Sequence, residues 1–295
     1  MIREYVPLAK HTTLGTGGPA RLFAQPESVD ELVELLGRAN EQEIPAAPIG
    51  LGSNLLVADE GFPGLALKLT GVLNAVVVQD GRMIAGGGVP LAVCLHRARA
   101  NNLGGIEFVC AIPGTVGGAV WMNAGAYGGD IAGVLERAHV TDAHGARWLT
   151  PEELGLRYRR SGLQQGQVVA AAEFKLERRL EEEIRETVRE MQKTRKEAQP
   201  TNKRTFGSVF KNPEHELSAG RMLEACGLKG FRLGGAQISP KHANFIENAG
   251  GATTADALAL IAEARRRALE QFGVRLEPEV QLLGPIEVPA LPSPS

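Results

Sequence analysis

The sequence predicts an α+β protein that folds in several lobes. Predicted helices and strands are mixed along the 295 residues without the regular alternation of a doubly wound sheet. The chain is 43% hydrophobic and 22% charged, which is ordinary for a globular protein with a large buried core. Its glycines gather in a few short segments, above all 112–129, and this indicates loops that approach a ligand closely.

The first part of the chain alternates helical and strand-like pieces. A helix is expected after Ser28, a good N-cap, because apolar residues recur at helical spacing from Val29 to Leu36. Residues 50–57 then form a small turn followed by an apolar strand, and 64–69 have the character of another strand. The segments 75–78 and 83–85 flank Asp80-Gly81, which is a strong hairpin signal.

The rest of the chain adds helices and further strands of one sheet. Pro90 opens a helix that runs through Arg99, and 181–199 is a charged helix ended by Pro200. A second long helix is expected over 256–272. The remaining strands of the sheet are predicted at 134–141, 147–149 and 168–176. The proline-rich residues 287–295 are expected to be a disordered tail.

Charge and composition exclude several classes of protein. The net charge of −2 provides no basic surface for nucleic acid, so no nucleic-acid partner is expected. Cys94, Cys110 and Cys226 are far apart and match no metal-ligand spacing, so we expect reduced thiols and no metal. The N-terminus lacks the apolar core of a signal peptide, and no apolar run reaches 18 residues. We therefore expect a cytoplasmic protein without membrane association.

The segment Ile112–Gly129 carries the most information about function. It contains six glycines and no charged residue before Asp130. Main-chain N–H groups in such a segment can hold a phosphate or a pyrophosphate. The alternative is a tight series of turns without a ligand.

Two other glycine-rich segments, 50–57 and 15–20, are candidates for a phosphate-binding loop. In 50–57, two glycines precede Ser53 and Asn54, which suits an anion; the alternative is a structural turn capped by Asn54. Residues 15–20 match a dinucleotide-binding pattern, but Pro19 stands where its helix should begin and no apolar strand precedes it. A turn or a second phosphate-proximal loop is the better interpretation. A P-loop motif is absent from the sequence.

Several polar segments carry side chains with useful chemistry. Each could be solvated surface alone, but together they suggest one pocket; they are 157–161, 205–213, 241–248 and 276–280. As an amphipathic strand, 205–213 would place Ser208, Phe210 and Asn212 on one face. Pro278 argues against simple strand pairing of its own segment.

Together these segments resemble, in order, the UDP-N-acetylenolpyruvoylglucosamine reductases, FAD enzymes of the second committed step of bacterial peptidoglycan synthesis. The matching segments are Thr12–Ala20, Gly50–Val57, Ile112–Gly129, Tyr158–Ser161, Gly207–Pro213, Ser239–Asn248 and Leu276–Val280. The glycine loops alone would indicate only the wider FAD-binding superfamily that contains vanillyl-alcohol-type oxidases. One departure is Ala111, where the family commonly has glycine; its methyl group is tolerable if φ is negative.

The resemblance implies a two-lobed FAD-binding domain of the vanillyl-alcohol-oxidase-like superfamily and a C-terminal α+β substrate-binding domain. The implied boundaries are 1–71 and 72–198 for the FAD-binding lobes and 199–274 for the substrate-binding domain, with a strand at about 275–286 that could return to the first lobe. The chain resembles the shorter type of this reductase, because it has no room for the tyrosine-bearing insertion of the longer type. A monomer is expected.

The implied reaction reduces UDP-N-acetylglucosamine enolpyruvate to UDP-N-acetylmuramate with NADPH, through non-covalent FAD. By resemblance, Arg159 and a protonated Glu279 stabilise negative charge on the substrate carboxylate, and Ser208 donates the proton. Because serine is a weak acid, Lys211 or an ordered water must polarise it.

The same resemblance assigns binding residues. Those expected to hold FAD are Gly50, Leu51, Gly52, Ser53, Asn54, Leu55, Ile112, Pro113, Gly114, Thr115, Gly117, Gly118, Asn123, Ala124, Gly125 and Ala126. Those expected to hold the UDP-sugar are Tyr158, Lys196 (or Arg195), Lys211, Asn212, Gln237 and His242.

Two other functions fit the sequence less fully. The first is another FAD oxidoreductase of the same superfamily, such as an oxidase with covalent flavin, from which denaturation would release no free flavin. The second is a nucleotide-sugar-binding protein without chemistry, which would be colourless and still bind the UDP-sugar.

Overall fold

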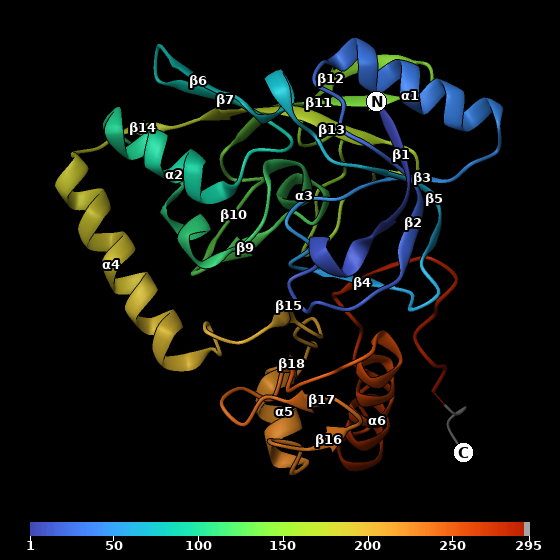
Figure 1. The fold of residues 1–295 in the computed structure, drawn as a ribbon. Coiled ribbons are helices and arrows are strands. Elements are labelled where there is room, and N and C mark those ends of the chain that lie inside the picture. Colours follow the sequence, from blue (N-terminus) through green and yellow to red (C-terminus); the bar gives the residue numbers. More distant parts are fainter. Residues whose placement is uncertain (292–295) are drawn as a thin grey trace. The chain divides into compact units, whose positions relative to one another are not determined.

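The computed structural model describes residues 1–291, which fall into two compact units (Figure 1). Unit 1 consists of Met1–Glu4, Arg21–Leu51 and Pro63–Arg195; unit 2 consists of Tyr5–Ala20, Gly52–Phe62 and the chain from Lys196 onward. Each unit is therefore assembled from segments that are distant in the sequence. The three-lobe boundaries given above remain a prediction.

The expected tail, 287–295, lies partly outside the described residues. In its described part, Arg265 donates a hydrogen bond of 2.6 Å to the carbonyl of Pro289. Val288 packs against the hydrophobic core of unit 2. Residues 287–291 are thus placed by contacts with the rest of unit 2.

The largest sheet of unit 1 is antiparallel, with the strand order β12-β11-β13-β7-β6. Its strands are β6 (Val76–Gln79), β7 (Arg82–Gly86), β11 (Leu135–Asp142), β12 (Gly145–Leu149) and β13 (Val168–Lys175). The turn between β6 and β7 has positive φ at Asp80 (51°) and Gly81 (76°), as a two-residue type I′ hairpin requires. The predicted hairpin and the predicted shared sheet are both confirmed.

The α-helices of unit 1 contribute buried residues to its two core clusters. They are α1 (Val29–Glu41), α2 (Leu91–Ala100), α3 (Val116–Trp121) and α4 (Glu181–Ala198). The Ser28 side chain accepts a hydrogen bond from the Glu31 N–H and caps α1 as predicted. Buried residues of α2 and α3 share one core cluster with β7, β11 and β13, whereas α1 packs in a separate cluster with β5 and β13.

A second, four-stranded sheet has the order β1-β2-β5-β3 and lies mostly in unit 1. Its strands are β1 (Ile2–Pro7), β2 (Pro19–Ala24), β3 (Ala46–Pro48) and β5 (Phe62–Leu67). Because β2 begins at Pro19, residues 15–20 lead into a strand rather than a helix. The rejection of a dinucleotide fingerprint at this position is confirmed.

Short elements complete unit 1. They are the 3₁₀ helices η2 (Gly71–Asn74) and η3 (Glu107–Ala111) and the strand pairs β8 (Leu103–Gly104) with β14 (Glu177–Arg178) and β9 (Gly125–Ala126) with β10 (Gly129–Asp130). Ala111 ends η3 and is not among the residues with positive φ. Its methyl group therefore causes no backbone strain at the point where the sequence departs from the family pattern.

Unit 2 contains an antiparallel sheet of order β15-β18-β17-β16, accompanied by two helices (Figure 1). Its elements are η1 (Leu8–His11), β15 (Thr205–Ser208), α5 (Ala219–Ala225), β16 (Arg232–Leu233), β17 (Ala236–Ile238), β18 (Phe245–Asn248) and α6 (Thr254–Phe272). A short parallel pair joins β4 (Leu55–Val57) to β19 (Gln281–Leu283), so the C-terminal segment pairs with an N-terminal one.

Two sequence expectations differ from the structure. Residues 116–121 of the glycine-rich segment form α3, because Thr115 provides a side-chain cap that accepts from the Gly118 N–H. The alternating pattern expected for 205–213 is wrong, since Val209 and Phe210 are both buried. The cause is Gly207, whose φ of 83° accompanies a register shift, so that β15 ends at Ser208.

The α+β fold class is confirmed by this arrangement of helices and mostly antiparallel sheets. Across residues 1–291, no helix combines the length and apolar character needed to cross a membrane. The same residues contain no group of three His, Cys, Asp or Glu side chains arranged to hold a metal ion. Cys94, Cys110 and Cys226 are free thiols.

The N-terminus of α6 is held by two different side chains. Thr253 and Asp256 form a capping box. In addition, the Asp59 carboxylate accepts hydrogen bonds of 2.9 Å from the main-chain N–H groups of Thr254 and Ala255. Asp59 therefore ties the segment after β4 to the start of the longest helix of unit 2.

We expect Asp59→Ala to destabilise the first turn of α6 by about 1–2 kcal/mol, because two N–H groups at the positive end of a helix dipole lose a charged acceptor. Hydrogen exchange of the α6 amides should become correspondingly faster. Glu60→Ala, which changes the exposed neighbouring carboxylate, is the control. Unchanged exchange in Asp59→Ala would show that the capping box suffices alone.

Candidate functional site

The structure distributes the predicted FAD-binding residues over four short segments. Gly50 and Leu51 follow β3 in unit 1, Gly52–Asn54 precede β4 in unit 2, Ile112–Gly118 run from η3 into α3, and Asn123–Ala126 lead from α3 into β9. Leu55 is the first residue of β4. The contacts within each unit show how these segments are held.

In unit 1, Gly50 lies directly against the glycine-rich segment. A Cβ atom on Gly50 would stand 2.7 Å from the Thr115 Oγ1 atom, which is closer than a carbon can approach. Thr115 is buried, and its hydroxyl is engaged as the cap of α3. Only glycine therefore fits at position 50 without disturbing this cap.

The glycine-rich segment is also joined by main-chain hydrogen bonds to the residues that follow β7. The Gly117 N–H donates to the Gly87 carbonyl at 2.8 Å, and a Cβ on Gly117 would stand 3.0 Å from that oxygen. The Val116 N–H donates to the Val89 carbonyl, and the Leu91 N–H donates to the Gly114 carbonyl. Gly87 was not among the predicted site residues, although the run Gly86–Gly88 in the sequence is typical of close main-chain packing.

Lys68 is a further residue that the sequence analysis missed. It follows β5, is half-buried, and its ammonium group donates a hydrogen bond of 2.7 Å to the Gly50 carbonyl. Burial lowers the pKa of this ammonium group. Within residues 1–291 no acidic side chain forms an ion pair with Lys68. A single lysine after an apolar strand offered little sequence signal.

Arg159 and Gly125 are brought together in unit 1. The guanidinium Nη2 atom of Arg159 donates to the Gly125 carbonyl at 2.6 Å. The guanidinium also lies over the Tyr158 ring, with 5.0 Å between its central carbon and the ring centroid. The predicted catalytic arginine is thus attached to the last part of the predicted FAD-binding segment.

In unit 2, the turn before β4 is held between two other segments. Gly52 has a φ of 66°, and a Cβ there would stand 2.1 Å from the His11 carbonyl oxygen. The Asn54 side chain donates to the Glu279 carbonyl at 3.2 Å, and the Gln281 N–H donates to the Asn54 carbonyl at 3.1 Å. A strand follows Asn54, so its side chain caps no helix and instead holds the segment that contains Glu279.

Ser208 and Glu279 come from neighbouring main-chain segments of unit 2. The Glu279 N–H donates to the Val209 carbonyl at 2.8 Å, and the Lys211 N–H donates to the Glu277 carbonyl at 3.0 Å. Pro278 lies opposite Phe210 between these two bonds, where no N–H is required. Pro278 therefore limits the pairing to one bridge without preventing it, and this bridge places Glu279 beside the end of β15.

The predicted substrate-binding residues of unit 2 have different local roles. The Lys211 ammonium pairs with the Glu277 carboxylate at 2.5 Å. The Asn212 side chain accepts from the Ala219 N–H at the start of α5, and the Gln237 side chain donates to the Gly230 carbonyl. The Lys196 carbonyl accepts from the Lys241 ammonium. In unit 1, Arg195 donates to the Cys110 carbonyl.

His242 is packed closely within unit 2. Its Nδ1 atom accepts a hydrogen bond from the Asn244 N–H at 3.2 Å, and a Cβ on Gly220 would stand 2.6 Å from its Cε1 atom. Burial, and then the charge of Lys229, lower the pKa of this imidazole. Both effects keep His242 neutral, as an acceptor at Nδ1 requires.

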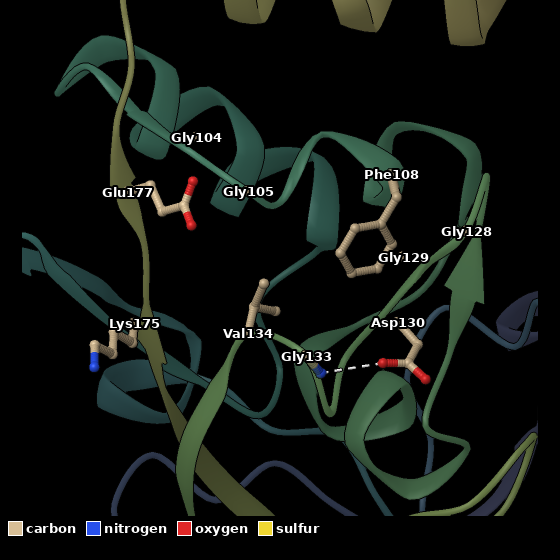
Figure 2. A pocket seen from close by; sticks show the side chains of 10 residues that line it. All are labelled: Gly104, Gly105, Phe108, Gly128, Gly129, Asp130, Gly133, Val134, Lys175 and Glu177. Carbon is tan, nitrogen blue, oxygen red and sulfur yellow. Dashed lines mark hydrogen bonds between the residues drawn. The ribbon is translucent and has the colours of Figure 1, made fainter.

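A cavity of about 320 Å³ lies in unit 1 at the far end of the glycine-rich segment (Figure 2). It is lined by Gly104, Gly105, Phe108, Gly128, Gly129, Asp130, Gly133, Val134, Lys175 and Glu177. None of these is a predicted site residue, and two of the three charged groups are acidic. The cavity is therefore not suited to a phosphate.

Comparisons with known proteins agree with the sequence resemblance. Residues 20–148 match the family model of the FAD binding domain, and residues 199–283 match that of the UDP-N-acetylenolpyruvoylglucosamine reductase C-terminal domain. The UDP-N-acetylenolpyruvoylglucosamine reductase of Bacillus pumilus is 40% identical over 286 residues, which cover 96% of this chain and 94% of the relative. The chain belongs to this reductase family.

Two further relatives agree with this assignment. The UDP-N-acetylenolpyruvoylglucosamine reductase of Latilactobacillus sakei is 42% identical over 96% of this chain and 93% of the relative. The crystal structure of the Thermus caldophilus reductase superposes with a TM-score of 0.84 at 39% identity, covering 96% of this chain and 100% of that one. The family predicted from the collinear segments is confirmed.

The environment of His242 predicts a pH dependence of stability. Because the folded pKa is below that of the unfolded chain, the unfolded chain binds the proton first as the pH falls, and stability is lost below the ordinary range of histidine. The thermal midpoint of His242→Gln should therefore change less between pH 7 and pH 5 than that of the unchanged protein. His144→Gln, at an exposed position, is the control, and equal slopes in all three proteins would contradict the prediction.

Proposed function

We propose that this protein reduces UDP-N-acetylglucosamine enolpyruvate to UDP-N-acetylmuramate with NADPH, through non-covalent FAD, in peptidoglycan precursor synthesis. Membership of the reductase family over nearly the whole chain supports the proposal. The observation that carries it is the bridge at Phe210 and Pro278, which places Ser208 and Glu279 on neighbouring segments. A proton donor beside a carboxyl group is what the reduction of an enolpyruvyl ether requires.

The residues present fit an FAD molecule. Gly50 lies against Thr115, two residues before Gly117, and none of these three residues has a bulky or charged side chain. Lys68 adds one ammonium group beside Gly50. These residues, together with Asn123–Ala126, would hold the diphosphate and ribityl parts of the cofactor. When bound, the flavin supplies the transfer of a hydride from NADPH to the vinyl carbon of the substrate.

Arg159 would stabilise the charge that develops on the substrate. Addition of a hydride to the vinyl carbon leaves negative charge that is delocalised into the neighbouring carboxylate. A guanidinium group stays charged at all relevant pH values and can donate two parallel hydrogen bonds to a carboxylate. Its attachment to the Gly125 carbonyl would keep this charge beside the flavin-binding segment.

Glu279 and Ser208 would complete the reaction. Glu279 can assist an anionic intermediate only as a protonated acid, so its half-buried position must become drier when the substrate binds. Ser208 would donate the proton to the intermediate carbon and recover it from solvent. Lys211, on the next segment, is held by Glu277.

The direct test of the proposed function is a product analysis. Purified protein, supplied with FAD, NADPH and UDP-N-acetylglucosamine enolpyruvate, should consume one NADPH for each substrate molecule that gains two hydrogen atoms. Acid denaturation should release all of the flavin. Oxidation of NADPH without a change in the mass of the UDP-sugar would contradict the proposal.

We expect Ser208→Ala to leave flavin reduction by NADPH within about two-fold and to slow reoxidation by the substrate by about a hundred-fold or more, because only the second step needs the proton. Rapid mixing under anaerobic conditions separates the two steps. Ser208→Cys, which keeps a proton donor of similar size, should retain part of the second rate. A normal second rate in Ser208→Ala would exclude the serine as the donor.

Gly50→Ala should reduce the FAD content of the purified protein, since the added methyl group displaces the Thr115 hydroxyl that caps α3. Gly37→Ala is the matched control, because a Cβ at Gly37 in α1 has no neighbour closer than 3.6 Å. The measurement is flavin absorbance per protein after denaturation. Equal FAD content in both variants would place the flavin away from Gly50.

A further inference from the structure

Backbone strain is concentrated around Arg159. Arg159, Asn123 and Tyr127 all have φ in the left-handed region, at 53°, 41° and 52°. This conformation costs a non-glycine residue about 1–2 kcal/mol and persists only where surrounding contacts impose it. Asn123 and Tyr127 belong to the glycine-rich segment, whereas Arg159 belongs to the turn at 157–160. The contacts between these two loops of unit 1 therefore determine where the guanidinium group lies.

Asn123 is the residue that joins the two loops. The residue is 3% exposed, and its side chain uses both of its donors and accepts one hydrogen bond. Its Nδ2 atom donates to the Arg157 carbonyl and to the Asp130 carboxylate, both at 3.2 Å, and its Oδ1 atom accepts from the Ala132 N–H at 2.9 Å. The Arg157 carbonyl also accepts from the Arg160 N–H, which closes the turn that contains Arg159.

Asp130 and the Ala132 N–H together fix which way the Asn123 amide points. An ionised carboxylate only accepts hydrogen bonds, so it must face the NH₂ group of Asn123 and not its oxygen. The amide then has to direct its donors to the Arg157 carbonyl as well. Asp130 is itself fixed, because its other carboxylate oxygen accepts from the Gly133 N–H at 3.1 Å, as Figure 2 shows.

Asp130 also fixes the acceptor of Arg159. In the small β9-β10 pair, Asp130 is the direct partner of Gly125, whose carbonyl receives the guanidinium hydrogen bond. An ideal Cβ on Gly125 would stand 2.8 Å from the Asp130 Cβ and 3.2 Å from the Arg159 Nη1 atom. Gly125 thus lies between Asp130 and Arg159, and only glycine leaves space for both.

We propose that Asn123 and Asp130 are positioning residues for Arg159: they hold its turn from one side and its carbonyl partner from the other. The inference rests on the proposed role of Arg159 toward the substrate carboxylate. Neither residue touches the reacting atoms in this role; each acts through Arg159. Loss of the Asp130 carboxylate should impair the step that uses Arg159 and should spare the reduction of the flavin by NADPH.

The decisive variant is Asp130→Asn. It keeps size and shape but replaces the charged acceptor with a neutral amide, so the Asn123 side chain, and with it the Arg157 carbonyl, is held less firmly. We expect reoxidation of the flavin by the substrate to slow by about ten-fold or more, mainly through a lower limiting rate at saturating substrate. The rate of flavin reduction by NADPH and the FAD content should both stay within about two-fold of those of the unchanged protein. Asp130→Glu keeps an acceptor-only carboxylate, so its rate of reoxidation should lie between those of Asp130→Asn and the unchanged protein.

A double variant separates positioning from a general structural role. If Asp130 acts through Arg159, Asp130→Asn should slow reoxidation no further in an Arg159→Lys background than Arg159→Lys does alone. Asp142→Asn is the matched control, because Asp142 also accepts a main-chain N–H but is the last residue of β11, before the turn to β12. Should Asp130→Asn lose FAD on purification, the same comparison is made with Asp130→Glu.

The outcomes distinguish this inference from the proposed function. If the unchanged protein is not reoxidised by the UDP-sugar, the proposed function fails. If it is, and Asp130→Asn slows both steps equally, or its effect adds fully to that of Arg159→Lys, the positioning role is overturned. A normal rate of reoxidation in Asp130→Asn overturns it as well.

Discussion

The candidate site depends on close packing at glycines, which leaves little or no space for a Cβ atom. Gly50 lies against the Thr115 side chain and Gly52 against the His11 carbonyl, both too close for any other residue type, and Gly117 lies tightly against the Gly87 carbonyl. Such contacts hold the loops in place through close packing at glycine rather than through long side chains. The cost in chain entropy is concentrated at these few positions, whereas the surrounding sheets and helices are ordinary in composition.

Loops built in this way carry almost no charge, and the acid, base and cationic groups must come from other segments. In unit 1, Arg159 is brought to the glycine-rich segment by its bond to Gly125. In unit 2, Ser208 and Glu279 are brought together by pairing around Pro278, a residue that permits one bridge and no longer ladder. Each unit thus combines a loop that is packed closely at glycines with the predicted catalytic side chains, which come from distant parts of the chain.

Much of this was predictable from the sequence, and the exceptions have physical causes. Local signals such as the cap at Ser28 and the turn at Asp80-Gly81 were read correctly, because they act over a few residues. The end of β15 was missed, because the alternating pattern does not reveal the register shift that accompanies the positive φ of Gly207. Lys68 and Asp130 were missed as well. Their roles arise only when β5 meets Gly50 and β10 meets β9.

The central claim is that one protein binds flavin with its glycine loops and uses separate side chains to pass reducing equivalents to a UDP-sugar. An anaerobic titration tests it most directly. NADPH should bleach the flavin of the purified protein, and subsequent addition of UDP-N-acetylglucosamine enolpyruvate, without oxygen, should restore the yellow colour in proportion to the substrate added. A protein that stays bleached after this addition, or that binds no flavin at all, would contradict the account.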